Sequence, residues 1–238
     1  MIDELLPASV VVVEAFGEEG VREFGNTALY PEEQALLTRA VDKRRREFTV
    51  VRGCARRAME KLGVPAQPVL RGERGAPCWP DGVTGSMTHC ADYSAAALAR
   101  AADLASLGID AEPDGPLPEG VLGAVALPEE TARLERLAAD RPEVNWDRIL
   151  FSAKESVYKA WFPLTGKWLD FDEADIDLAA DTRHAVVDAG PAAGAQGAFR
   201  ARLLVPGPVV GGRRVGYFDG RWAVRQGLVA TAVTVPHG

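Results

Sequence analysis

The chain has 238 residues, of which 47% are hydrophobic and 26% are charged, a composition typical of a globular protein with a sizeable core. Its formal net charge of −7 argues against a general nucleic-acid binder, so a site for a polyanion must come from a local basic cluster. The sequence contains no run of about 18 uncharged apolar residues, and its N-terminus lacks the features of a signal peptide. We therefore expect a cytoplasmic protein with no membrane or nucleic-acid partner.

The three cysteines, Cys54, Cys78 and Cys90, are an odd number and form no C-x-x-C pair. This pattern argues against a disulfide framework or a structural zinc site, and it fits a reducing compartment. The sequence also lacks the P-loop, Rossmann and G-x-S-x-G motifs, which leaves those three enzyme classes without support.

The predicted elements alternate between strands and helices in a way that indicates two α+β halves packed together. In chain order they are a buried strand at 8–16, one or two helices within 31–63, a loop with short extended pieces at 69–89, strands at 93–100 and 104–112, a turn or linker at 113–120, helices at 128–139 and 145–162, a surface loop at 186–196, and antiparallel strands at 197–205, 214–226 and 228–235. Asp219-Gly220 is the expected hairpin turn. The linker places the boundary between an N-terminal half, 1–112, and a C-terminal half, 113–238.

An aromatic stripe with a carboxylate in its middle runs along the second predicted helix of the C-terminal half, in the stretch FSAKESVYKAWF. The aromatic members are Phe151, Tyr158 and Phe162. Such a stripe typically packs into a core, where the carboxylate of Glu155 needs a partner. Glu155 either pairs with Lys159 at i,i+4 near the surface or binds a cation or donor elsewhere in the fold.

Two further carboxylates, Asp110 and Glu112, lie in the predicted strand segment GIDAE. Side chains alternate along a strand, so both point to the same side. They are either solvated acids at a strand end or, since oxygen ligands suit Mg²⁺, part of a metal site. With Glu155 as a third ligand, Lys154 and Lys159 would add positive charge for a phosphate bound to the same ion.

Positive charge is concentrated in the helical region before residue 63 and in the glycine-rich segment that follows it. The basic residues of the helical region are Lys43, Arg44, Arg45, Arg46, Arg52, Arg56 and Arg57. They form either a solvated helix face or a phosphate site built from bidentate guanidinium groups. In the following segment, RGERGAPCWPDGVTGSMTH, glycines allow backbone N–H groups to approach an anion, and Thr88 and His89 could donate to phosphate oxygens. His89 could instead be a core histidine.

Taken together, the motifs GAPCWPDGVTGSMTH, GIDAEP and FSAKESVYKAWF resemble those of the phosphopantetheinyl transferases of the larger Sfp/EntD-like type. The resemblance covers roughly residues 30–175, and KRRREFTVVRGCAR and KAWFPLTGKWLDF make it closest to the actinobacterial members. It implies an α+β fold of two pseudo-symmetric halves with coenzyme A in the cleft between them. It also implies a monomeric holo-[acyl-carrier-protein] synthase that depends on Mg²⁺. Such an enzyme transfers 4′-phosphopantetheine to a serine of an apo acyl or peptidyl carrier protein and releases adenosine 3′,5′-bisphosphate.

The resemblance also implies roles for individual residues. Asp110, Glu112 and Glu155 would be the metal ligands, and Glu155 would also be the base for the serine hydroxyl, directly or through a water. Lys159 would contact the diphosphate and leaving group. The residues expected to bind coenzyme A are Arg44, Arg52, Arg71, Gly72, Glu73, Arg74, Ser86, Thr88, His89, Lys154 and Lys159. The alternative is a module that binds coenzyme A or a carrier protein without chemistry.

Overall fold

The computed structural model describes residues 1–181 and 194–237. Of the surface loop predicted at 186–196, residues 186–193 lie outside the described residues. The α-helices are α1 (Gly17–Phe24), α2 (Pro31–Ala35), α3 (Asp42–Lys61), α4 (Val121–Val125), α5 (Pro128–Asp140) and α6 (Trp146–Thr165), and the 3₁₀ turns are η1 (Asp3–Leu5), η2 (Glu73–Gly75) and η3 (Phe171–Glu173). The strands are β1 (Val11–Phe16), β2 (Leu70–Arg71), β3 (Pro77–Cys78), β4 (Val83–Cys90), β5 (Tyr93–Arg100), β6 (Leu104–Pro113), β7 (Ala174–Ala180), β8 (Gln196–Leu203), β9 (Val209–Val210), β10 (Arg213–Arg214), β11 (Tyr217–Arg225) and β12 (Leu228–Pro236).

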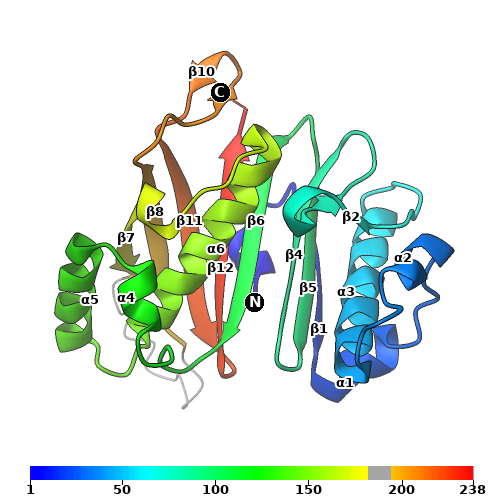
Figure 1. Ribbon diagram of the computed structural model, residues 1–238, viewed down its shortest axis with the longest axis horizontal. Coiled ribbons are helices and arrows are strands. Elements are labelled where there is room, and N and C mark those ends of the chain that lie inside the picture. Colours follow the sequence, from blue (N-terminus) through cyan, green and yellow to red (C-terminus); the bar gives the residue numbers. More distant parts are fainter. Residues whose placement is uncertain (182–193, 238) are drawn as a thin grey trace.

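The N-terminal region is a three-stranded antiparallel sheet with strand order β1-β5-β4, covered by α1–α3 on its outer side (Figure 1). Helix α3 packs on this sheet because apolar residues recur along one of its faces at helical spacing. The residues of this face are Phe48, Val51, Ala55 and Ala58, all at most 2% exposed. The helices predicted within 31–63 are therefore confirmed as two, α2 and α3.

The second sheet contains five antiparallel strands in the order β6-β12-β11-β8-β7, with α6 lying across its front and α4 and α5 beside it (Figure 1). The core between α6 and this sheet is built around Trp222, which is fully buried and meets Trp146 edge-on at 5.3 Å between ring centroids. Leu150, Ala153 and Val157 of α6 are also fully buried in it. This core orients α6 and thereby the side chains on its opposite edge.

Side-chain hydroxyl groups join the two sheets where β4 lies beside β6. The N–H of Ile109 donates to Ser86 Oγ at 3.1 Å, and the N–H of Ala111 donates to Thr88 Oγ1 at 3.1 Å.

The mixed α/β class is confirmed by these sheets and helices, whereas the pseudo-symmetry of the halves and the boundary after residue 112 stay predictions. Strand β6, assigned to the N-terminal half from the sequence, pairs with β12 and so belongs to the second sheet.

The structure corrects the predicted hairpin. Asp219 and Gly220 lie inside β11, opposite Arg200 and Phe199 of β8, and the chain turns instead between β11 and β12. A glycine is needed at position 220 because a Cβ there would lie 2.2 Å from the Phe199 ring. The turn falls at Gln226-Gly227, where both residues have positive φ angles, 55° and 73°, as two-residue hairpin turns require.

The segment 69–89 is also more regular than the sequence indicated. It contains the short strands β2 and β3, as expected, but its last part enters β4, a strand of eight residues. This strand is hard to recognise in the sequence because it contains glycine and hydroxyl residues, and tertiary burial between β5 and β6 stabilises it.

Among the described residues, no helix has the combination of length and apolar character needed to cross a bilayer.

Candidate active site

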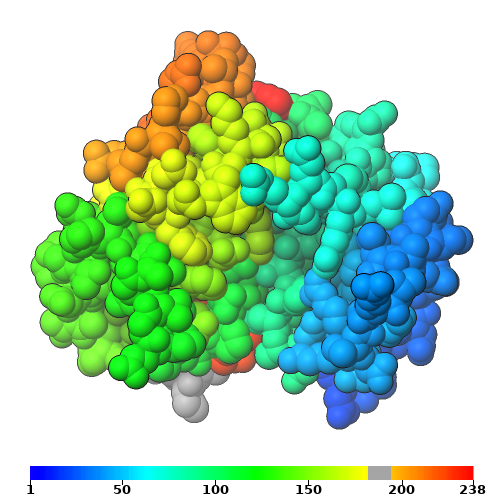
Figure 2. All heavy atoms as spheres, in the orientation of Figure 1, coloured from blue at the N-terminus to red at the C-terminus, as the bar shows by residue number. Residues whose placement is uncertain are grey.

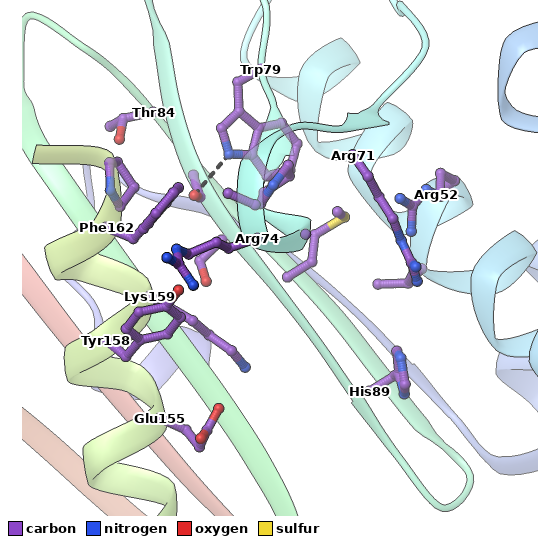
Figure 3. Close-up of a pocket in the computed structure, with 18 of the residues that line it drawn as sticks. Arg52, Arg71, Arg74, Trp79, Thr84, His89, Glu155, Tyr158, Lys159 and Phe162 are labelled. Carbon is purple, nitrogen blue, oxygen red and sulfur yellow. Dashed lines mark hydrogen bonds between the residues drawn. The ribbon is translucent and has the colours of Figure 1, made fainter. Parts of the chain in front are cut away.

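A pocket of about 550 Å³ lies between the N-terminal region and α6. In Figure 2 the surface is hollowed between the two regions, and the cyan segment around residue 75 reaches across toward α6. The predicted site residues that line the pocket are Arg44, Arg52, Arg71, Arg74, Ser86, His89, Glu155 and Lys159. Glu155 and Lys159 enter it from α6, and Arg52 and Arg71 lie on the opposite side (Figure 3).

The wall opposite α6 is rich in partly buried positive charge. Arg52 is buried, stacks on the ring of Phe48 at 3.5 Å, and donates to the carbonyl oxygen of Val69 at 3.2 Å. Burial lowers the pKa of Arg52 to about 10, opposed by Glu33 and reinforced by repulsion from Arg71 and Arg44. Burial likewise lowers the pKa of Arg71, and Arg44 adds to the effect. Cations that repel one another around the buried Arg52 favour an anionic ligand.

Arg44 also contacts His89, the histidine predicted to bind phosphate. Its Nη1 donates to Nε2 of His89 at 2.7 Å, so the imidazole accepts at this nitrogen. Burial lowers the pKa of His89, and the neighbouring Arg44 lowers it further. The neutral ring is therefore favoured, which leaves its other nitrogen as the donor.

On the α6 side of the cleft, Asp110 of β6 is held by three donors. Lys159 Nζ donates to its Oδ1 at 2.7 Å, Ser152 Oγ donates to its Oδ2 at 2.8 Å, and Thr88 Oγ1 lies 3.4 Å from Oδ1. Lys159 thus pairs with Asp110 and also lines the pocket. Thr88 contacts β6 and does not line the pocket, although the sequence placed it among the phosphate contacts.

The other two predicted metal ligands carry perturbed carboxyl groups. Burial raises the pKa of Glu155, with Lys159 opposing the shift and Asp110 adding to it. Burial also raises the pKa of Glu112, Asp110 adds to it, and Arg148 opposes it through an ion pair of 3.2 Å. Burial and the nearby Asp110 both disfavour the charged forms of Glu155 and Glu112. A divalent cation between these carboxylates would stabilise the charged forms, and all the ligand atoms would be oxygens, so these residues fit Mg²⁺. Within the described residues, no three His, Cys, Asp or Glu side chains are already gathered as a metal cluster.

The aromatic stripe of α6 lies differently from the sequence expectation. Phe162 is largely buried, but Tyr158 is half-buried and the two line the pocket, with 5.9 Å between their ring centroids. Phe151 is also half-buried and meets Phe171 at 6.1 Å. The face that enters the core is a different one, made of Ile149, Leu150, Ala153, Val157, Ala160 and Trp161. Glu155 lies on the same side of α6 as Tyr158 and Phe162, which line the pocket. Its carboxylate is therefore at the cleft and not in the core, so it does not need a partner buried in the core.

The side chain of Lys154 does not line the pocket and lies away from its arginine-rich wall. Its amine donates to the carbonyl oxygens of Phe171 at 2.6 Å and Ala174 at 2.8 Å, and it pairs with the buried Glu130 at 2.9 Å. The structure therefore places this amine in the scaffold behind α6, in contrast to the expected coenzyme A contact.

The segment 72–74 supplies one pocket residue of the three predicted. Arg74 adopts a left-handed conformation with φ of 52°, lines the pocket, and lies over the ring of Trp168 at 5.3 Å. Glu73 is exposed and lies outside the lining, and the N–H of Gly72 is already used by the carbonyl oxygen of Ala76 at 2.8 Å.

Sequence reasoning missed several residues around the site. Trp79, whose indole donates to the carbonyl oxygen of Gly85 at 2.8 Å, forms a pocket wall (Figure 3). Ser152 and Arg148 hold Asp110 and Glu112, respectively. Arg148 had a detectable signal, because it lies seven residues before Glu155 and therefore on the same face of the helix.

The fold and the site define an enzyme-like protein with an arginine-walled anion pocket and acidic residues beside it. Comparison with known proteins identifies its family: the chain belongs to the 4′-phosphopantetheinyl transferases, so it is an enzyme that transfers this group. Residues 32–99 match the 4′-phosphopantetheinyl transferase N-terminal domain, and residues 106–205 match the 4′-phosphopantetheinyl transferase superfamily. The resemblance inferred from the motifs is thus confirmed.

Some curated relatives cover nearly the whole chain and others about half of it. The chain is 57% identical to the 4′-phosphopantetheinyl transferase Svp of Streptomyces mobaraensis, over 99% of this chain and 89% of the relative. It is 45% identical to the 4′-phosphopantetheinyl transferase PptT of Mycobacterium tuberculosis, over 99% and 98%. Enterobactin synthase component D of Salmonella typhi is 34% identical over 52% of this chain and 51% of the relative. The expected similarity to actinobacterial members is confirmed by the first two.

Proposed function

We propose that this enzyme transfers the 4′-phosphopantetheine group of coenzyme A to a serine of an apo acyl or peptidyl carrier protein. The observation that carries this proposal is that one pocket contains both the arginine wall and the Glu155–Lys159 pair of α6. The family supplies the group transferred. The pocket supplies a place for a polyanionic donor beside a carboxylate that can accept a proton.

The arginine wall would bind the adenosine end of coenzyme A. Arg44, Arg52 and Arg71 lie close enough to repel one another, as their pKa shifts show for Arg52 and Arg71, and a 3′-phosphate among them would remove that repulsion. His89 and Arg74 extend the wall toward α6 and would contact the diphosphate. Binding from this side leaves the diphosphate near Lys159.

In the chemical step the serine oxygen attacks the diphosphate phosphorus that carries the pantetheine arm. The bond from this phosphorus to the bridging oxygen breaks, and adenosine 3′,5′-bisphosphate leaves with the electron pair. Glu155, from its place in the pocket, takes the hydroxyl proton directly or through a water. Lys159 supplies positive charge for the oxygens on which negative charge develops.

Asp110, Glu112 and Glu155 would hold Mg²⁺, since their oxygen-only set suits a hard cation. The ion, when bound, would contribute positive charge to the diphosphate oxygens. We further infer a cytoplasmic monomer that acts on carrier proteins and binds neither membranes nor nucleic acid. These finer points rest on the sequence pattern and on family resemblance.

The test is mass spectrometry of an apo acyl carrier protein and an apo peptidyl carrier protein after incubation with enzyme, coenzyme A and Mg²⁺. The wild type should add phosphopantetheine to at least one carrier. Glu155→Gln should lower turnover about 10²- to 10⁴-fold, the usual contribution of a general base, and Asp110→Ala should also be strongly impaired. Glu60→Gln, an exposed acid on α3, is the control. Near-normal turnover in both site variants would overturn the mechanism. A wild type that binds coenzyme A but labels no carrier would favour the non-catalytic binding module.

A further inference from the structure

Helix α6 and strand β6 lie against each other in a regular, antiparallel match. Ser106 Oγ donates to the carbonyl oxygen of Ala160 at 2.8 Å, and Gly108 packs on the backbone of Ser156. Two positions further along β6, Asp110 meets Ser152, and two further still, Glu112 meets Arg148. Each step of two residues along the strand therefore matches a step of four residues along the helix.

The match follows from the geometry of the two elements. Four helical residues rise about 6 Å, and two strand residues extend about 6.6 Å, so facing side chains stay nearly in step over several contacts. Strand side chains two apart and helix side chains four apart each lie on one face. As a result, each acid on this face of β6 meets its own donor from α6.

The donor for Glu112 is held more firmly than an ordinary surface arginine. Arg148 Nη1 reaches Glu112 Oε2 at 3.2 Å, while Nε donates to the carbonyl oxygen of Gly115 at 2.9 Å and Nη2 to that of Pro116 at 2.8 Å. The Arg148 side chain is only 15% exposed. Three contacts in different directions fix the plane of the guanidinium group.

The contact with Glu112 uses a single carboxylate oxygen. Arg148 holds Oε2, and within the described parts of the chain Oε1 has no hydrogen-bond donor. A bidentate pair would have occupied both oxygens. The one-point contact instead fixes the carboxylate and leaves one oxygen available for a cation.

We propose that Arg148 is a positioning residue that orients Glu112 for the metal ion. It anchors the carboxylate to the 115–116 backbone, so that Glu112 is set beside Asp110 before the ion binds. The inference rests on the proposed function, because it needs Glu112 as a metal ligand. Groups that orient metal ligands typically change metal affinity about 10- to 100-fold when they are replaced.

Asp147 provides a matched control. Its Oδ2 accepts from the N–H of Leu117 at 2.8 Å, so it ties the same connecting segment to the first turn of α6. Asp147 is itself an acid and offers Glu112 no positive charge, and the ion pair of Glu112 in the described residues is with Arg148. Asp147→Ala removes this tie and the contact of Asp147 Oδ1 with the backbone N–H of Arg148, but it deletes none of the three contacts of the Arg148 guanidinium group.

The experiment measures Mn²⁺ affinity by electron paramagnetic resonance of the free ion, with enzyme saturated by coenzyme A and no carrier protein present. A blank with coenzyme A alone is subtracted. The variants are Arg148→Gln, Arg148→Lys, Asp147→Ala and Asp110→Ala, each checked for a cooperative thermal melt. Steady-state KM for coenzyme A and kcat with Mg²⁺ are measured in parallel.

Both Arg148 variants should bind Mn²⁺ about tenfold more weakly, because a lysine keeps the charge but cannot make the three contacts at once. KM for coenzyme A should stay within about twofold of wild type, and Asp147→Ala should keep wild-type Mn²⁺ affinity. Tighter binding by Arg148→Gln with wild-type binding by Arg148→Lys would mean that only charge matters, and would overturn the proposal. An equal loss in Asp147→Ala, or failure of both Arg148 variants to fold, would overturn it too.

Failure of the underlying function gives a different result. If wild type and Asp110→Ala bind Mn²⁺ equally, the acidic residues are not the metal site, and both the site assignment and the role of Arg148 are refuted. If Asp110→Ala loses Mn²⁺ while both Arg148 variants keep it, the metal site stands and only the positioning role is refuted.

Discussion

Gly108 of β6 lies directly against the backbone of α6, where a Cβ atom at Gly108 would be 2.0 Å from the carbonyl oxygen of Ser156 and 2.7 Å from the nitrogen of Ala160. No side chain fits between strand and helix at this point. The close approach is what allows Ser152 and Arg148, in the earlier turns of α6, to reach Asp110 and Glu112.

Gly108→Ala should therefore push α6 away from β6. Overpacking of this kind typically costs about 1–3 kcal/mol, and the separation should also lower turnover because the acids lose their donors. Urea unfolding and carrier labelling measure the two effects. The control is Gly123→Ala in α4, where a Cβ would meet nothing within 4 Å. A Gly108→Ala enzyme with wild-type stability and turnover would show that the contact between helix and strand is dispensable.

Lys154→Met should destabilise the protein more than it affects coenzyme A binding. The substitution leaves Glu130, which is 1% exposed, without its cation, and breaking such a buried pair typically costs about 3–5 kcal/mol. Urea unfolding gives the stability, and the KM for coenzyme A of the folded variant at low temperature should match wild type. A large rise in KM with unchanged stability would restore Lys154 to the coenzyme A contacts predicted from the sequence.

Arg71→Gln should weaken the enzyme for coenzyme A but much less for 3′-dephospho-coenzyme A. Arg71 is exposed and, among the described residues, makes no ion pair, so its loss should leave the fold intact. A hydrogen bond to a charged group contributes about 1.5–3 kcal/mol, which corresponds to about a tenfold or greater rise in KM. Arg57→Gln, an exposed arginine outside the pocket, controls for net charge. Equal effects on both substrates would move Arg71 to a part of the ligand common to the two.

The stability of the second sheet should depend on pH through Asp175 of β7. Burial would raise the pKa of Asp175, but hydrogen bonds from Arg202 and Arg133 outweigh it and hold the pKa below its ordinary value of 3.8. A lowered folded-state pKa means that the carboxylate stabilises the protein above pH 3.8, and that this contribution is lost as the pH falls through the folded value. In urea unfolding, Asp175→Asn should be less stable than wild type at neutral pH, with the gap closing in acid. A gap independent of pH would contradict this account.

The sequence by itself determined the family, the fold class and most of the elements. Hydrophobic periodicity predicts α3 and α6 because a helix repeats its buried face within a few residues, information that lies wholly in the local sequence. The arginine-rich helix and the acids of GIDAE were likewise visible as charge patterns. Eight of the predicted site residues, Arg44, Arg52, Arg71, Arg74, Ser86, His89, Glu155 and Lys159, line one pocket.

Only the tertiary structure decided which way these side chains turn. Lys154 and Glu155 are neighbours in the chain, yet one enters the scaffold toward Glu130 and the other enters the pocket. Arg148 and Glu112 are 36 residues apart, and they meet because α6 packs closely on β6 at Gly108. Local patterns specify periodicity and charge, but the partner of a charged group depends on how distant elements pack, which no short stretch of sequence contains.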